Sequence, residues 1–134
     1  DIKTIALIGN ILSMHDPSLD KVDEIVLHKD GFINEGAKSN IFFVKEGKVY
    51  TPPLSQNILP GITRSYIIDL LRTNEIEILE EEIPVNFIYD SEEVWLTSST
   101  KEIQPVEQVN DYIICAESSN TPLWKKVLYL YNQD

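Results

Sequence analysis

The chain has 134 residues, of which 43% are hydrophobic and 25% charged, values ordinary for one soluble globular domain. Its net charge of −11 argues against nucleic acid and anionic membranes as partners, although a few backbone N–H groups can still bind a phosphate on an acidic protein. No run is long enough to span a bilayer and nothing resembles a signal peptide. The single cysteine, Cys115, cannot form an internal disulfide, so we expect a cytoplasmic protein.

Up to residue 54, the pattern predicts one helix followed by strands and turns. In chain order these are a buried helix over 4–14, a loop over 15–23, a strand over 24–28, a turn over 29–31 and strands over 41–45 and 48–51. Glu46-Gly47, between the last two strands, is a two-residue connection of the tight-hairpin kind. Glu35 stands alone before the strand over 41–45, where an isolated acid is either a solvated loop charge or a group held inside a site.

From residue 59 on, helices and strands alternate. In chain order we expect a helix over 62–72, a strand over 76–79, a solvated acidic turn over 80–82, a short helix over 84–89, strands over 93–97, 103–109 and 112–115, and a last helix over 121–131. Thr121 is expected to cap the last helix, with Pro122 in its first position. There is no internal repeat or linker, so the sequence predicts one mixed α/β domain over 1–134.

Two ionisable residues suit a cofactor that carries an aldehyde and a pyridine ring. Lys3 stands directly before an apolar segment, and a lysine in dry surroundings can form an imine with an aldehyde. Glu35 could hydrogen-bond a protonated ring nitrogen. Taken alone, each residue is better explained by its plain alternative, an exposed lysine near a chain end and a solvated loop acid.

Two segments of small and polar residues could bind a phosphate. Leu59-Pro60-Gly61-Ile62-Thr63-Arg64 places a glycine at a helix entrance, which leaves the N–H groups of Ile62 and Thr63 free for an anion. Ordinary helix capping explains this segment equally well. Thr97-Ser98-Ser99-Thr100 places four hydroxyls at the end of a buried strand, where cofactors commonly bind in α/β folds, although a plain polar turn is the alternative.

The other residues with reactive side chains indicate no site. His15 and His28 lack acids or cysteines at ligand spacing, so no metal site is predicted. Trp95 and Trp124 are expected in the core, and Cys115 has no visible partner for nucleophilic chemistry.

Four motifs, taken in order, resemble one family. They are D-I-K-T at 1–4, I-N-E-G-A-K-S-N-I-F at 33–42, I-L-P-G-I-T-R at 58–64 and L-T-S-S-T-K-E-I-Q-P-V at 96–106. Together they resemble the fold-type IV enzymes that use pyridoxal 5′-phosphate: D-amino acid aminotransferases, branched-chain aminotransferases and aminodeoxychorismate lyases. The resemblance implies an α/β fold, the mixed α–β barrel-like C-terminal domain of these enzymes.

The resemblance implies the chemistry of Lys3 and Glu35. Lys3 matches the lysine that holds the cofactor as a Schiff base and moves a proton at the substrate's α-carbon. Glu35 matches the acid that keeps the pyridine nitrogen protonated. A protonated ring can accept the charge that deprotonation leaves on the α-carbon, and the pyridinium compensates the burial of the acid.

The resemblance also assigns the two ends of a phosphate site. Ile62 and Thr63 match the pair at a helix start that binds the cofactor phosphate. Ser99 and Thr100 match a second phosphate-binding loop, whose backbone also faces the substrate in related enzymes.

On this resemblance we expect an aminotransferase that moves an amino group from an amino acid to a 2-oxo acid. E-G-A-K-S-N and D-I-K favour the D-amino acid type. The alternatives are an aminodeoxychorismate lyase, which eliminates pyruvate, then a branched-chain aminotransferase, and last a non-catalytic domain that kept the fold. Family members carry an N-terminal domain before the lysine, so we interpret the chain as the C-terminal cofactor domain, which we expect to form a homodimer and to transaminate poorly alone.

Overall fold

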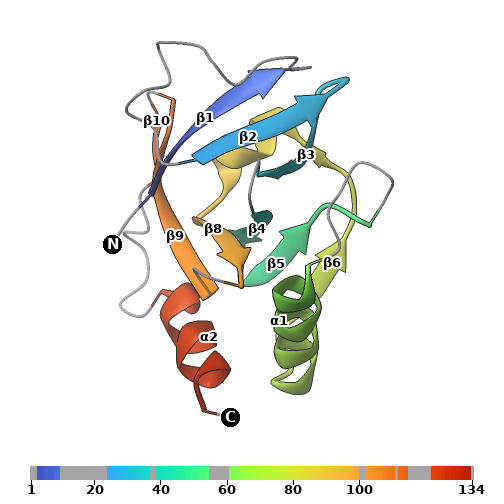
Figure 1. The fold of residues 1–134 in the computed structure, drawn as a ribbon, viewed down its shortest axis with the longest axis vertical. Helices are drawn as coiled ribbons and strands as arrows, with labels where there is room; N and C mark the ends of the chain where they lie inside the picture. Colours follow the sequence, from blue (N-terminus) through green and yellow to red (C-terminus); the bar gives the residue numbers. More distant parts are fainter. Residues whose placement is uncertain are drawn as a thin grey trace.

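The computed structural model describes residues 3–9, 24–36, 39–54, 61–99, 102–110, 112–114 and 122–133. Within them, ten strands form one sheet, with two α-helices and a 3₁₀ helix (Figure 1). The strands are β1 (Lys3–Gly9), β2 (Glu24–Lys29), β3 (Phe32–Gly36), β4 (Asn40–Lys45), β5 (Lys48–Thr51), β6 (Ile78–Glu80), β7 (Ile83–Pro84), β8 (Glu93–Ser98), β9 (Glu102–Val109) and β10 (Tyr112–Ile113). The helices are α1 (Ile62–Thr73), η2 (Val85–Asp90) and α2 (Leu123–Tyr131).

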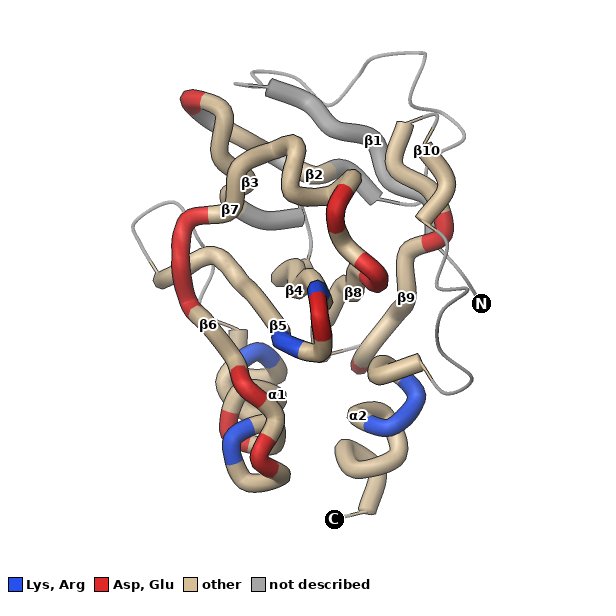
Figure 2. Tube along the Cα trace, turned by 180° about the vertical axis from the view of Figure 1, so that it is seen from behind, with Lys and Arg blue, Asp and Glu red and all other residues tan. Residues whose placement is uncertain are grey.

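The sheet has the order β6-β5-β4-β8-β9-β1-β2-β3-β7, and β10 pairs with β9. β1 runs parallel to both of its neighbours, and β5 runs parallel to β6. The two end strands, β6 and β7, are joined along the chain by Glu81 and Glu82 alone. The acidic run over 80–82 at this junction is red in Figure 2. The sheet therefore curls back toward its own first strand, as the predicted barrel-like domain requires.

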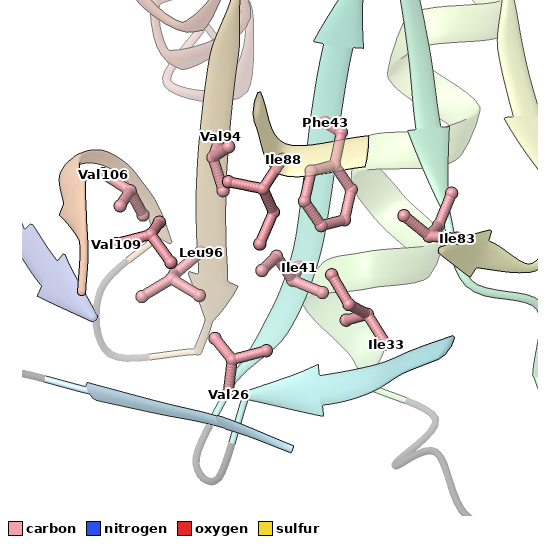
Figure 3. Packing of buried hydrophobic residues seen from close by; sticks show 10 residues of the cluster. All are labelled: Val26, Ile33, Ile41, Phe43, Ile83, Ile88, Val94, Leu96, Val106 and Val109. Carbon is pink, nitrogen blue, oxygen red and sulfur yellow. The ribbon is translucent and has the colours of Figure 1, made fainter. Parts of the chain in front are cut away.

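The first core cluster fills the inside of the curled sheet. Its side chains come from strands on both sides and point toward one another (Figure 3). β4 shows why the sheet is apolar on both faces: Ile41 and Phe43 belong to this cluster, whereas Phe42 and Val44 belong to a second one. Because side chains alternate along a strand, a strand buried on both faces has a continuous apolar run.

The second core cluster lies between the outer face of the sheet and the two α-helices. α1 contributes Ile67, Ile68 and Leu71, and α2 contributes Val127. The helices lie side by side at one end of the molecule, and Tyr66 of α1 contacts Tyr131 of α2 edge to face at 5.2 Å (Figure 1). No helix in the described part of the chain has the length and apolar character needed to cross a membrane.

Most predicted elements are confirmed within a few residues: the strand over 24–28, the hairpin of 41–45 and 48–51, the helix over 62–72, and the strands over 76–79, 93–97, 103–109 and 112–115. Glu46 and Gly47 both have positive φ, 52° and 76°, as the tight turn requires. The short helix predicted over 84–89 is the 3₁₀ helix η2. The last helix begins at Leu123, with Pro122 in the cap position, and Thr121 lies outside the described residues.

The predicted helix over 4–14 is wrong, because residues 3–9 form strand β1 and residues 10–14 lie outside the described part. β1 pairs on both sides with parallel strands. Such strands have near-continuous apolar runs, which periodicity cannot separate from a short buried helix.

The segment around Glu35 also differs from the prediction. Glu35 lies in strand β3, opposite Leu27 of β2, and not in a loop. Asp30-Gly31 is the two-residue turn between β2 and β3, with φ of 55° and 83°. This Asp-Gly pair is a hairpin signal that predicts β3 when it is combined with the strand before it. The two-residue strand β7 is too short to be predicted.

Candidate phosphate site at the start of α1

The site lies where β4 begins and β8 ends, because these neighbouring strands run antiparallel. Phe42 pairs with Trp95 and Asn40 with Thr97 in their antiparallel register. These four residues face the helices, because Phe42 and Trp95 belong to the helix-side cluster and side chains alternate along each strand. The helix-facing column therefore changes from aromatic to polar at its last pair, Asn40 and Thr97.

α1 begins over this polar pair. Its cap residue is Gly61, with extended backbone at φ −72° and ψ 141°, and no side chain of the described residues caps the helix. A helix leaves its first N–H groups without intrahelical acceptors, so those of Ile62 and Thr63 remain available. A methyl group added at Gly61 would lie 2.6 Å from Oδ1 of Asn40. The glycine thus lets the helix start approach β4 more closely than any other residue would.

The start of α2 has the opposite character. Glu93 is 7% exposed, and its carboxylate accepts hydrogen bonds from the backbone N–H of Leu123 at 2.7 Å and of Trp124 at 2.9 Å. It accepts a third from Nε1 of Trp95 at 2.9 Å. A buried carboxylate therefore satisfies the positive end of α2. α1 has no acidic residue in its first turn.

A cavity of about 210 Å³ lies at the start of α1. Its walls come from three segments. They are Ser39 with the first residue of β4, the cap residue Gly61 with the first two residues of α1, and the last two residues of β8 with Ser99, which follows them. None of the described residues that line it is acidic, although the whole chain has a net charge of −11. The cavity is thus lined by hydroxyl, amide and helix-start N–H groups, which suit an anion.

Among the described residues of this wall, the hydroxyl of Thr97 is the one buried polar side-chain atom without a hydrogen-bond partner. Thr97 is 0% exposed. Thr63 is also buried, whereas the side chain of Ile62 is 88% exposed. Ile62 therefore offers the cavity its backbone N–H group and not its side chain.

Arg64 fixes the first turn of α1 to the sheet. The residue is 2% exposed, and its Nη2 donates to the carbonyl of Pro52 at 2.9 Å and to Glu80 at 3.0 Å. The same carboxylate accepts a bond from Arg72, at the end of α1, at 3.2 Å. The turn predicted over 80–82 is therefore wrong for Glu80, which ends β6 and pairs with both arginines. All three acids are exposed, as predicted.

The structure brings three of the six predicted site residues together. Ile62, Thr63 and Ser99 line the same cavity. Thr100 lies outside the described residues. The sequence does not single out Ser39 and Asn40 as site residues, because nothing local shows that β4 begins beneath α1.

Lys3 and Glu35 are described by their backbone only. Lys3 opens β1, beside Val106 of β9, and β9 in turn pairs with β8. Glu35 precedes Ser39 of the cavity wall by four residues, so their Cα atoms are at most about 15 Å apart. Lys3 therefore lies on the strand two places along the sheet from β8, and Glu35 lies on the strand that precedes Ser39 in the chain.

The fold and the cavity together define an α/β protein with a cavity suited to an anion between a helix start and strand ends. Comparison with known proteins gives the family. The model of the amino-transferase class IV family matches residues 1–109. The chain therefore belongs to the class IV aminotransferase family.

Its relatives include enzymes of two substrate types. The chain is 39% identical over 103 residues to the branched-chain-amino-acid aminotransferase of Salmonella typhimurium. This match covers 77% of this chain and 33% of that protein. The chain is 33% identical over 110 residues to the D-alanine aminotransferase of Staphylococcus epidermidis, covering 82% of this chain and 39% of that protein. The chain thus spans well under half the length of these relatives.

The fold comparison agrees with the family. The crystal structure of the Escherichia coli branched-chain amino acid aminotransferase superposes with a TM-score of 0.78 at 26% identity. The match covers 95% of this chain and 50% of that one. The predicted α/β fold of this family is therefore confirmed.

Proposed function

We propose that the cavity at the start of α1 binds the phosphate of pyridoxal 5′-phosphate, and that the chain supplies the cofactor site of a class IV aminotransferase. The observation that carries the proposal is that a helix start and strand-end hydroxyls meet around one cavity, where the described residues provide neither a side-chain cap nor an acidic group. A phosphate dianion is stabilised by helix-start N–H groups and by hydroxyl donors.

The residues present fit such a group. The N–H groups of Ile62 and Thr63 would hold it from the helix side, and the hydroxyls of Thr63 and Ser99 from two sides of the cavity. Thr100, next to Ser99, would continue the second side. The absence of a side chain at Gly61 supports the fit, because any Cβ there would meet Asn40.

Lys3 and Glu35 would act at the other end of the cofactor. The amine of Lys3 would hold the cofactor covalently through its aldehyde carbon and, when released, would take a proton from the substrate's α-carbon. Glu35 would keep a proton on the ring nitrogen. The bound cofactor supplies an electron sink for the pair of electrons left at that carbon.

For the substrate, we propose a D-amino acid as amino donor and a 2-oxo acid as acceptor. The motif E-G-A-K-S-N supports the D-amino acid type, and the S. epidermidis relative is a D-alanine aminotransferase. A branched-chain L-amino acid is the second candidate, because the S. typhimurium relative has the higher identity.

We also propose that groups outside this chain complete the substrate site, since the relatives are more than twice as long as the matched region. A cytoplasmic homodimer fits the proposal, and sedimentation analysis tests the dimer.

The experiment offers the intact protein, loaded with pyridoxal 5′-phosphate, three reactions in parallel. These are amino transfer from D-alanine to 2-oxoglutarate, amino transfer from L-leucine to 2-oxoglutarate, and pyruvate release from aminodeoxychorismate without an oxo acid. We expect the first to be fastest. A faster second or third reaction would replace the D-amino acid proposal by the branched-chain or the lyase alternative.

Cofactor attachment is tested separately from turnover. Borohydride reduction followed by peptide mass spectrometry should find the cofactor on Lys3, and Lys3→Ala should abolish the label. Lys126→Ala, a change at an exposed position of α2, is the control and should keep it. A label that survives Lys3→Ala would remove Lys3 from the proposed site.

A further inference from the structure

We propose that the hydroxyl of Thr97 is a further hydrogen-bond donor to the phosphate, at the base of the cavity. The inference rests on the proposed function, because it names one more group of the same phosphate site. The residue lies on β8, between the strand's apolar part and its last residue, Ser98.

The hydroxyl of Thr97 has no hydrogen-bond partner in the described structure, and the residue is 0% exposed. The hydroxyl is therefore shielded from bulk solvent, and a buried hydroxyl without a partner is unfavourable. Thr97 lines the cavity together with the start of α1. An oxygen of a ligand that fills the cavity would lie beside Thr97 and would be the acceptor that its hydroxyl lacks in the described structure.

Thr51 shows what a buried threonine does elsewhere in this sheet. It is 1% exposed, and its hydroxyl donates to the carbonyl of Ile41 at 2.7 Å. The hydroxyl of Thr51 thus stabilises the sheet, whereas the hydroxyl of Thr97 bonds to no described group. Valine has the same shape as threonine and is at least as well suited to a buried strand, so the fold alone does not require a hydroxyl at position 97.

The two threonines give a matched test. The dissociation constants (Kd) of pyridoxal 5′-phosphate, inorganic phosphate and pyridoxal are measured by calorimetry for the intact protein, Thr97→Val, Thr97→Ser and Thr51→Val, and thermal unfolding is recorded without ligand. A hydrogen bond to a charged group corresponds to roughly a tenfold change in Kd or more. For Thr97→Val we therefore expect about tenfold weaker binding of both phosphate ligands, unchanged binding of pyridoxal, and a melting temperature that is unchanged or higher.

The other two variants separate the hydroxyl from the shape of the side chain. Thr97→Ser keeps the donor and should bind the phosphate ligands within about threefold of the unaltered protein. Thr51→Val should lower the melting temperature while leaving all three dissociation constants unchanged, because its hydroxyl bonds to the sheet and lies outside the cavity wall.

The following results would contradict the proposed role of Thr97. Equal phosphate binding by Thr97→Val would overturn the role of Thr97 and leave the proposed phosphate site standing. Equal weakening for pyridoxal, or a melting temperature that falls as in Thr51→Val, would show a structural role instead. If the unaltered protein bound neither phosphate ligand, the proposed function would fail, and this inference with it.

Discussion

Gly61→Ala tests the close approach of α1 to β4. The backbone at Gly61 has φ −72° and ψ 141°, which alanine adopts without strain. The new methyl group would lie 2.6 Å from Oδ1 of Asn40, and its next neighbours, in Arg64, would be at an ordinary 3.8 Å. The substitution therefore introduces one steric conflict and no conformational one.

Two opposing effects set the change in the free energy of unfolding that Gly61→Ala causes. Overpacking at a buried contact costs about 1–3 kcal/mol, and Asn40, at 5% exposed on a central strand, has little room to move. Alanine also reduces the conformational entropy of the unfolded chain, and this stabilisation offsets about 0.4–1 kcal/mol of the overpacking cost. We expect a net loss of about 1–2 kcal/mol in the free energy of unfolding, or roughly 4–8 °C in melting temperature for a chain of this size.

The assay is a double-mutant cycle with Asn40→Ala, read by urea unfolding and by the Kd of pyridoxal 5′-phosphate. Removing Oδ1 of Asn40 removes the conflict, so Gly61→Ala should change stability by less than about 0.5 kcal/mol in that background. In the unaltered background it should also weaken cofactor binding about tenfold, because the helix N–H groups move away from the wall formed by β8. Ser65→Ala, at an exposed position in the same turn, is the control and should change neither quantity.

The reasoning would be refuted if Gly61→Ala lowered stability equally in both backgrounds, since the contact with Asn40 would then not be the cause. It would also fail if Gly61→Ala kept full stability and full cofactor affinity.

Three further predictions concern groups that hold the helices and turns in place, and urea unfolding measures each of them. Glu93→Ala should lower the free energy of unfolding by about 3 kcal/mol, because it leaves one buried and two partly buried N–H donors without their acceptor. An effect no larger than that of the exposed control Glu107→Ala would contradict this. Arg64→Met should lower the free energy of unfolding by about 2–3 kcal/mol and Arg72→Met by less than about 0.5 kcal/mol, because the first arginine is buried and the side chain of the second is 57% exposed. Equal losses would show that burial does not decide how much each ion pair with Glu80 stabilises the fold. Glu46→Asn should stabilise by about 0.5 kcal/mol, since asparagine tolerates the φ of 52° in this turn better than glutamate; a loss of stability would refute that explanation.

Local signals in the sequence predicted the parts of the fold that depend on neighbouring residues. The Glu46-Gly47 turn, the helix that begins after Gly61 and the hydroxyl run that ends β8 all follow from residues a few positions apart. The motifs also identified the family, because each one is a short segment that can be recognised without its surroundings. Three residues of these motifs, Ile62, Thr63 and Ser99, line one cavity in the structure.

Only the tertiary structure decided the features that join distant segments. Residues 3–9 are a strand and not a helix because β2 and β9 lie on both sides to receive their hydrogen bonds, and the spacing of apolar residues cannot show that. Glu93 caps a helix that begins 30 residues later, so the local prediction of Thr121 as the cap could not find it. Asn40 and Thr97 line the cavity because β4 and β8 pair beneath α1. The walls of a cavity come from segments that are distant in the sequence, and only folding brings such segments together.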